Sequence, residues 1–140
     1  MNNKRYKQKI DRLFYFVWIP TIVLLGIGTA IAAGAPVALA ILIATDLFTL
    51  YFLISPFFGY VELGDGELFI KFGFFAKLTI PYDKIRGVCK EKKIYADSVM
   101  SLKNSLEHVN VKYNRFDIVS VSVTDNDGLI RELDMRIQSK

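Results

Sequence analysis

Two long apolar segments near the N-terminus constrain this 140-residue chain more than any other feature. Residues 13–33 contain no charged side chain, and residues 37–58 contain only Asp46. An α-helix rises about 1.5 Å per residue, so about twenty apolar residues cross a hydrocarbon layer about 30 Å thick. Both segments are therefore predicted to be membrane-spanning helices.

The two segments are separated only by residues 34–36, Gly-Ala-Pro, which break the helix. So short a turn makes the helices antiparallel. Tyr15 and Trp18 then lie near the start of the first helix, and Tyr51 and Tyr60 near the end of the second. Amphipathic rings favour the headgroup level, so these four residues are expected to share one membrane interface.

Basic charge is concentrated in the first twelve residues, which hold five Lys or Arg and one Asp, while the whole chain has a net charge of +4. Basic flanks of membrane helices stay in the cytoplasm. We therefore expect a multi-pass protein of the cell membrane, with a basic cytoplasmic tail (residues 1–12), a hairpin (13–58) and a cytoplasmic C-terminal domain (60–140). The same placement of charge argues against nucleic-acid binding.

A cleaved signal peptide covering residues 1–33 is an alternative interpretation of the N-terminus, since it has a charged start, an apolar stretch and an Ala-rich end. Two features argue against it. The apolar run exceeds the roughly 7–15 residues of a signal peptide, and a second apolar run follows at once.

Small residues recur every four positions in both apolar segments. Gly26 and Ala30 do so in the first, and Pro36, Ala40 and Ala44 in the second. Small side chains let membrane helices approach closely, so these faces are candidates for contact between the helices. The alternative is that membrane helices are simply rich in Ala and Gly.

Asp46 is the candidate functional residue of the hairpin, because an ionisable group inside a membrane span costs a few kcal/mol. Counting from the turn places it level with position 23, so Thr21, Thr45 and Thr49 are expected donors, and Gly26 leaves room beside it. Protonation of the Asp46 carboxyl to its neutral form would also lower this cost. Two roles stay open: a polar contact that locks the hairpin or an oligomer, and a contact for a membrane-active peptide or partner protein.

From residue 60 onward the pattern changes to short alternating stretches typical of a mainly β domain. Asp65-Gly66 is a hairpin turn signal. Strands are predicted at residues 61–63, 67–72, 77–81, 85–90, 109–113 and 118–123. Thr124 and Asp127 then predict the start of an amphipathic C-terminal helix that covers the sheet.

The soluble part resembles the small bacterial PH-like domains of the YyaB-like family. The likeness covers roughly residues 60–137 and is carried by the segments Asp65-Gly66-Glu67-Leu68, Ile70-Lys71-Phe72-Gly73, Ile80-Pro81-Tyr82-Asp83-Lys84-Ile85, Ser101-Leu102-Lys103-Asn104-Ser105-Leu106-Glu107, Val111-Lys112-Tyr113 and Val121-Ser122-Val123. The resemblance implies a PH-like barrel closed by a C-terminal helix, behind a membrane anchor. The sublancin immunity protein type belongs to this family, which implies protection against an exported antimicrobial peptide (bacteriocin).

The sequence contains no motif for catalysis, for a cofactor or for a metal. Cys89 and His108 are each the single residue of their type, and no partner of metal-ligand spacing accompanies either. His108 is interpreted as a surface or half-buried structural residue. The first hairpin loop carries Asp65 and Glu67, whose carboxylates would repel a phosphoinositide headgroup. We expect neither an enzyme nor a lipid-phosphate receptor.

The sequence therefore predicts a membrane-anchored PH-like binding module, with an immunity role as its specific form. The alternative is a structural or adaptor subunit of a larger bacterial membrane complex. Expected partners are the lipid bilayer and either another membrane protein or a membrane-active peptide, and a homo-oligomer is compatible with the same features.

Overall fold

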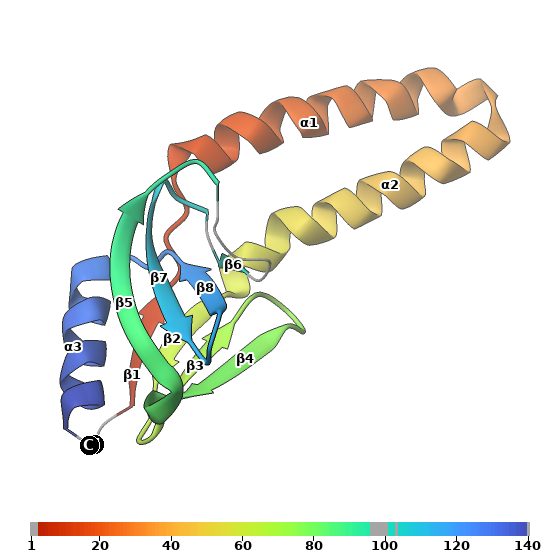
Figure 1. The fold of residues 1–140 in the computed structure, drawn as a ribbon. Helices are drawn as coiled ribbons and strands as arrows, with labels where there is room; N and C mark the ends of the chain where they lie inside the picture. Colours follow the sequence, from red (N-terminus) through yellow and green to blue (C-terminus); the bar gives the residue numbers. More distant parts are fainter. Residues whose placement is uncertain (1–2, 96–100, 103, 140) are drawn as a thin grey trace.

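The computed structural model describes residues 3–95, 101–102 and 104–139. A long helical hairpin leaves one side of a β domain (Figure 1). The hairpin consists of α1 (Arg12–Ile31), the 3-10 turn η1 (Ala32–Gly34), α2 (Pro36–Ile54) and the 3-10 turn η2 (Ser55–Phe58). Asp11 caps α1, since its Oδ1 accepts a hydrogen bond from the N–H of Arg12 at 2.7 Å. Pro36 begins α2, where its missing N–H costs no hydrogen bond.

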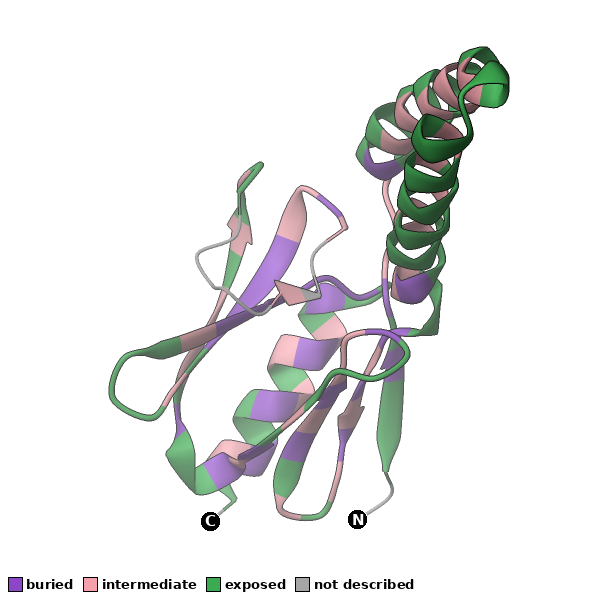
Figure 2. Ribbon diagram, turned by 90° about the vertical axis from the view of Figure 1, so that its right-hand side faces the viewer, coloured by how far each residue is buried: buried purple, intermediate pink, exposed green. Residues whose placement is uncertain are grey.

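Both helices are long and apolar enough to cross a bilayer, over Arg12–Gly34 and Pro36–Phe58. These segments agree with the predicted runs 13–33 and 37–58. Their most apolar stretches are not buried inside the protein, and Figure 2 shows both helices largely exposed. An exposed apolar surface of this size marks an interaction with lipid or with another protein.

The two helices touch along a stripe of half-buried residues spaced by three and four. The stripe consists of Trp18, Thr21, Leu25, Gly28 and Thr29 in α1, with Leu39, Leu42, Asp46, Thr49 and Leu53 in α2. Gly26, Ala30, Ala40 and Ala44 are exposed instead. The small-residue faces therefore do not form the contact between α1 and α2, contrary to expectation, because larger side chains at coiled-coil spacing fill it.

Two four-stranded sheets make up the β domain. The first has the antiparallel order β1 (Lys4–Lys7), β2 (Tyr60–Leu63), β3 (Glu67–Lys71) and β4 (Lys77–Pro81). The second has the order β5 (Ile85–Lys92), β7 (Glu107–Tyr113), β8 (Asp117–Val121) and β6 (Ser101–Leu102), with β6 parallel to β8. The predicted strands and the β2–β3 hairpin are confirmed.

The basic segment at the N-terminus is part of the fold, where the sequence predicted a separate tail. Tyr6 of β1 pairs with Val61 of β2 and is only 5% exposed. The chain then crosses to the second sheet, where the N–H of Lys9 donates to the carbonyl of Ser122 at 2.9 Å. Residues 4–11 therefore link the two sheets.

The predicted barrel is wrong in one respect, because the two sheets do not close. Between β4 and β5 the chain turns through the 3-10 turn η3 (Tyr82–Lys84), and no ladder joins these strands in the described part of the chain. On the other side, the isolated bridges Gln8–Val123 and Ile10–Asn104 connect the N-terminal segment to the second sheet. Single bridges leave both sheets separate.

Helix α3 (Asn126–Gln138) lies against the second sheet and contributes Leu129 and Leu133, both fully buried, to the core. The helix begins one residue later than predicted. Asp125 is its N-cap and accepts a hydrogen bond from the N–H of Gly128 at 2.8 Å. Thr124 therefore lies one residue before the cap, and its N–H donates to the carbonyl of Lys7 at 3.1 Å, which is part of the link between the sheets.

Candidate functional site

An apolar groove lies between α1 and α2 near the middle of the hairpin. Its volume is about 300 Å³. The groove is lined by Ile22, Leu25, Gly26, Ile43, Asp46, Leu47, Thr49 and Leu50. A Cβ atom placed on Gly26 would meet no atom within 4 Å, so the glycine leaves this side of the groove open.

Asp46 is the acidic residue of the groove, and within the described part of the chain only one of its two oxygens has a partner. Oδ2 accepts a hydrogen bond of 2.7 Å from Oγ1 of Thr29. Oδ1 is buried and receives no hydrogen bond from any described residue. A buried acceptor without a donor is unfavourable, and a carboxylate can accept several hydrogen bonds. Asp46 therefore has a buried acceptor oxygen whose hydrogen bond no described residue supplies.

Three of the predicted site residues, Gly26, Asp46 and Thr49, are brought together in this groove. Thr21 does not reach Asp46, since its hydroxyl donates to the carbonyl of Val17 in its own helix at 2.9 Å. Thr45 likewise donates to the carbonyl of Ile41.

The partner that the sequence analysis missed is Thr29. Side chains tilt toward the N-terminus of their own helix. In α2 that direction is toward the turn, so the Asp46 carboxylate reaches beyond position 23 to Thr29. The prediction counted residues along the hairpin and did not include the direction of the Cα–Cβ bond, which would have indicated Thr29.

Aromatic side chains fill the junction between the hairpin and the β domain. A second cavity, of about 340 Å³, lies there and has Phe14, Trp18, Tyr51 and Phe74 among its lining residues. Backbone contact is also close at this junction. Gly73 has φ of +147°, and a Cβ atom at this position would overlap Oγ of Ser55. The β3–β4 loop is therefore fitted tightly against η2.

Strands β2 to β8 and α3 correspond to a known family, whereas β1 lies outside the matched residues. The family model described as Bacterial PH domain matches residues 59–136, which is more than half of the chain. The chain belongs to the bacterial PH domain family. Domains of the PH type are in general non-catalytic binding modules. No curated protein and no solved structure matches the chain.

The PH domain holds its first hairpin loop in place with Arg136, which is only 4% exposed. The guanidinium group donates from Nη1 to the carbonyls of Leu63 at 3.1 Å and Gly64 at 2.7 Å. The hydroxyl of Tyr82 donates to the same Gly64 carbonyl at 2.8 Å. Burial raises the pKa of Tyr82, and the neighbouring Arg136 partly opposes that shift. Arg136 therefore organises the loop from inside the domain.

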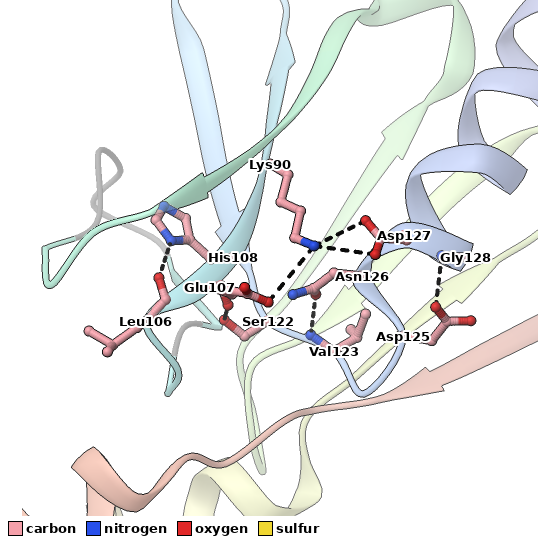
Figure 3. Close-up of polar contacts among 10 residues, drawn as sticks. All are labelled: Lys90, Leu106, Glu107, His108, Ser122, Val123, Asp125, Asn126, Asp127 and Gly128. Carbon is pink, nitrogen blue, oxygen red and sulfur yellow. Dashed lines mark hydrogen bonds and ion pairs between the residues drawn. The ribbon is translucent and has the colours of Figure 1, made fainter.

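A polar cluster joins β5, β7 and α3 of the PH domain (Figure 3). Nζ of Lys90 lies 3.1 Å from Oδ1 of Asp127 and 3.8 Å from Oε2 of Glu107. His108 is fully buried, deeper than the half-buried position expected, and its Nδ1 lies 3.2 Å from the carbonyl oxygen of Leu106. The described residues contain no group of three His, Cys, Asp or Glu side chains that could hold a metal ion. Through Lys90, the cluster connects the start of α3 to β5 and β7.

Proposed function

We propose that this protein is a membrane-anchored binding module that receives a partner inside the bilayer. Helices α1 and α2 cross the cell membrane, and both the N-terminus and the PH domain lie on the cytoplasmic side. The partner binds at the groove around Asp46. The observation that supports this proposal most is the buried, unpaired Oδ1 of Asp46 in an otherwise apolar groove.

The lining of the groove defines the chemistry of the partner. Leucine and isoleucine side chains suit an apolar segment that is itself inserted in the membrane. A hydroxyl, amide or ammonium group on that segment would donate to Oδ1 and would offset the cost of a polar group in hydrocarbon. We therefore propose a membrane-inserted helix or peptide with one polar donor on its contact face.

The partner class that fits these requirements is a membrane-active antimicrobial peptide. Such peptides are amphipathic and often cationic, which complements the single carboxylate of the hairpin. The protein would then be an immunity protein that captures the peptide in the membrane before it forms a pore. The resemblance to YyaB-like proteins, which include the sublancin immunity type, supports this choice.

The test is expression of the full chain in a bacterium that is sensitive to a panel of purified pore-forming peptides. We expect the wild-type protein to raise the inhibitory concentration of at least one peptide. Asp46→Leu should abolish the protection, whereas Asp46→Asn, which keeps a hydrogen-bonding group, should retain most of it. Thr45→Val is the matched control, because its hydroxyl bonds only within α2.

Two results would contradict the proposal. Unchanged tolerance to every peptide would remove the immunity role, and full protection by Asp46→Leu would remove the groove as the binding site. Reporter fusions at the two termini test the anchor separately. Reporters on opposite sides of the membrane would reject the hairpin topology.

A second candidate function is that of a structural or adaptor subunit in a larger membrane complex, or in a homo-oligomer. It is favoured by the outward orientation of Gly26, Ala30, Ala40 and Ala44, which leaves the small-residue faces available to another helix. A photoreactive residue at Ala40, compared with one at the exposed Val23, tests it in native membranes. Adducts with lipid alone at both positions would reject this candidate.

A further inference from the structure

We propose that the PH domain is seated on the lipid surface by a membrane-contacting edge made of Phe74, Phe75 and Ile94. The edge places these three side chains in the outer part of the hydrocarbon layer, just below the headgroups, on both sides of the point where the hairpin enters the membrane. This inference rests on the proposed membrane anchoring. It concerns a different surface from the groove around Asp46.

Large apolar side chains are exposed at only a few described positions of the PH domain, and half of them belong to this edge. Outside the hairpin, the exposed large apolar residues of the described chain are Phe74, Phe75, Ile94, Tyr95, Phe116 and Met135. Phe75 and Ile94 are each 82% exposed. Two such side chains at loop positions beside the same pair of apolar helices indicate a common apolar environment.

The β3–β4 loop carries Phe74 and Phe75 to the last turns of α2. The ring of Phe74 lies 4.7 Å from that of Phe58 and 5.6 Å from that of Tyr51, measured between centroids. Phe75 stacks near Tyr51, with centroids 6.3 Å apart and planes inclined by 14°. In Figure 1 this loop extends to the same side of the domain as the hairpin. The apolar surface of α2 thus continues directly onto the loop.

Ile94 occupies the corresponding place beside α1. It shares a small cavity of about 170 Å³ with Leu13, Val17 and Trp18, which belong to the first turns of that helix. Ile94 follows the end of β5, whereas Phe75 lies between β3 and β4, so the two side chains come from different sheets. The edge therefore flanks the hairpin through both sheets, which would fix the orientation of the domain on the membrane.

Helix geometry gives the depth of this edge. Tyr51 follows Pro36 by fifteen residues, or about 22 Å along α2, while the hydrocarbon layer is about 30 Å thick. If Pro36 lies at the boundary of the hydrocarbon layer farther from the PH domain, Tyr51 and the stacked Phe75 lie roughly 5–10 Å inside the boundary nearer to it. Lys71 and Lys77 pair at the base of the same loop, where ammonium groups would meet anionic headgroups.

The experiment uses the full chain in vesicles of phosphatidylcholine and phosphatidylglycerol, with Trp18→Phe as the background and Phe75→Trp as the single reporter. Vesicles whose lipids carry bromine atoms near the top of the acyl chains quench a tryptophan at that depth. Phe116→Trp in the same background is the matched control, because Phe116 is 83% exposed but lies in the β7–β8 turn. Figure 1 shows that turn at the end of the sheet away from α1.

We expect brominated lipid to quench the tryptophan at position 75 several-fold more strongly than the one at position 116, with a blue-shifted emission only at position 75. Equal, weak quenching at both positions would overturn the membrane-contacting edge. Protection of position 75 from aqueous acrylamide without quenching by lipid would also overturn it, because a protein contact would then cover the loop. The native Trp18 of the unmodified protein distinguishes this proposal from the proposed membrane anchoring. If brominated lipid quenches Trp18 but not the tryptophan at position 75, the membrane anchoring is supported and the membrane-contacting edge is rejected.

Discussion

Thr29 donates a hydrogen bond of 2.7 Å from Oγ1 to Oδ2 of Asp46, and this bond joins the last turn of α1 to the middle of α2. The same hydroxyl lies 3.0 Å from the carbonyl oxygen of Leu25, so its single hydrogen is shared between two acceptors. The contact locks the hairpin through one oxygen of Asp46 and leaves the other unused. Both roles considered for Asp46, hairpin contact and partner contact, are thus compatible with the same geometry.

Replacing Thr29 by valine should weaken the hairpin, because the shape is kept and the hydrogen bond to Asp46 is lost. Interhelical hydrogen bonds in membranes contribute about 0.5–1.5 kcal/mol, so we expect a loss of that size in the free energy of unfolding in lipid bicelles. In an Asp46→Leu background the same change should cost almost nothing. Thr21→Val is the control, since that hydroxyl bonds only to Val17 in its own helix. Equal effects of Thr29→Val and Thr21→Val would contradict the pairing.

Gly73→Ala should destabilise the junction between the hairpin and the PH domain. Its φ of +147° is unfavourable for any residue with a Cβ, and the added atom would overlap Oγ of Ser55. We expect a loss of about 1–3 kcal/mol in the unfolding free energy, together with faster amide hydrogen exchange in the β3–β4 loop.

Gly66→Ala is the matched control for this change. Gly66 lies in the β2–β3 turn, and a Cβ there would meet no atom within 4 Å. Its effect should stay within about 0.5 kcal/mol. Combining Gly73→Ala with Ser55→Ala should restore part of the loss, because the overlap with Oγ is removed while the backbone strain remains. No difference between the two glycine variants would show that the loop is not fitted against η2.

The sequence predicted those strands and helices in which buried apolar side chains recur at a regular spacing. Strand alternation in Val109 and Val111 located β7, and the Asp65-Gly66 signal located the β2–β3 hairpin. Strand β1 escaped prediction because Lys4, Arg5 and Lys7 surround a single buried residue, Tyr6. An edge strand is held by backbone hydrogen bonds, which leave no trace in a pattern of side chains.

The hairpin shows the same limit for contacts between helices. The two apolar runs were evident from composition, but the side chains that meet were not, because nearly every residue in a membrane span is apolar. A spacing of four residues led to the prediction that Gly26 and Ala40 lie at the contact between the helices. The observed contact stripe has spacings of both three and four residues and includes Leu42. Likewise, whether the sheets close depends on the ladders at β4 and β5, which no local pattern encodes.

The stability of the PH domain should fall at alkaline pH because of Tyr82. Burial raises the pKa of this tyrosine above its ordinary value of 10.0. The folded state therefore holds the phenolic proton more tightly than the unfolded state, so this contribution is fully present below pH 10.0 and is lost as the pH rises through the folded-state pKa. Urea unfolding across this pH range, with tyrosinate absorbance as a second measurement, would detect the slope.

Tyr82→Phe should remove part of that slope and should also cost about 1 kcal/mol at neutral pH, since the hydrogen bond to the carbonyl of Gly64 is lost. Tyr113 has a pKa raised by burial and, to a lesser extent, by Asp117, so some slope should remain. Tyr113→Phe should reduce it further. If Tyr82→Phe left the pH dependence of unfolding unchanged, burial of the phenol would not control it.

Leu133→Ala should destabilise the PH domain, because this side chain of α3 is fully buried in the core beside Leu129. Truncating a buried leucine removes its transfer free energy and leaves a cavity, at a cost of roughly 2–5 kcal/mol. Met135→Ala on the same helix is the control, since Met135 is 53% exposed and should contribute less than about 0.5 kcal/mol. Thermal unfolding in nanodiscs would compare them, and similar losses would mean that α3 does not pack through Leu133.

Tyr6→Ala tests whether the basic N-terminal segment belongs to the fold. Tyr6 is 5% exposed and lies in the apolar core, opposite Val61 of β2. Removing its ring should lower the unfolding free energy of the PH domain by about 2–4 kcal/mol and should expose the amides of β2 to hydrogen exchange. Lys7→Ala is the control, because that side chain is exposed on the same strand. If residues 4–7 were a free cytoplasmic tail, both substitutions would change the unfolding free energy equally little. A larger loss for Tyr6→Ala than for Lys7→Ala would show that these residues form a strand and do not act only as basic charges that orient the membrane helices.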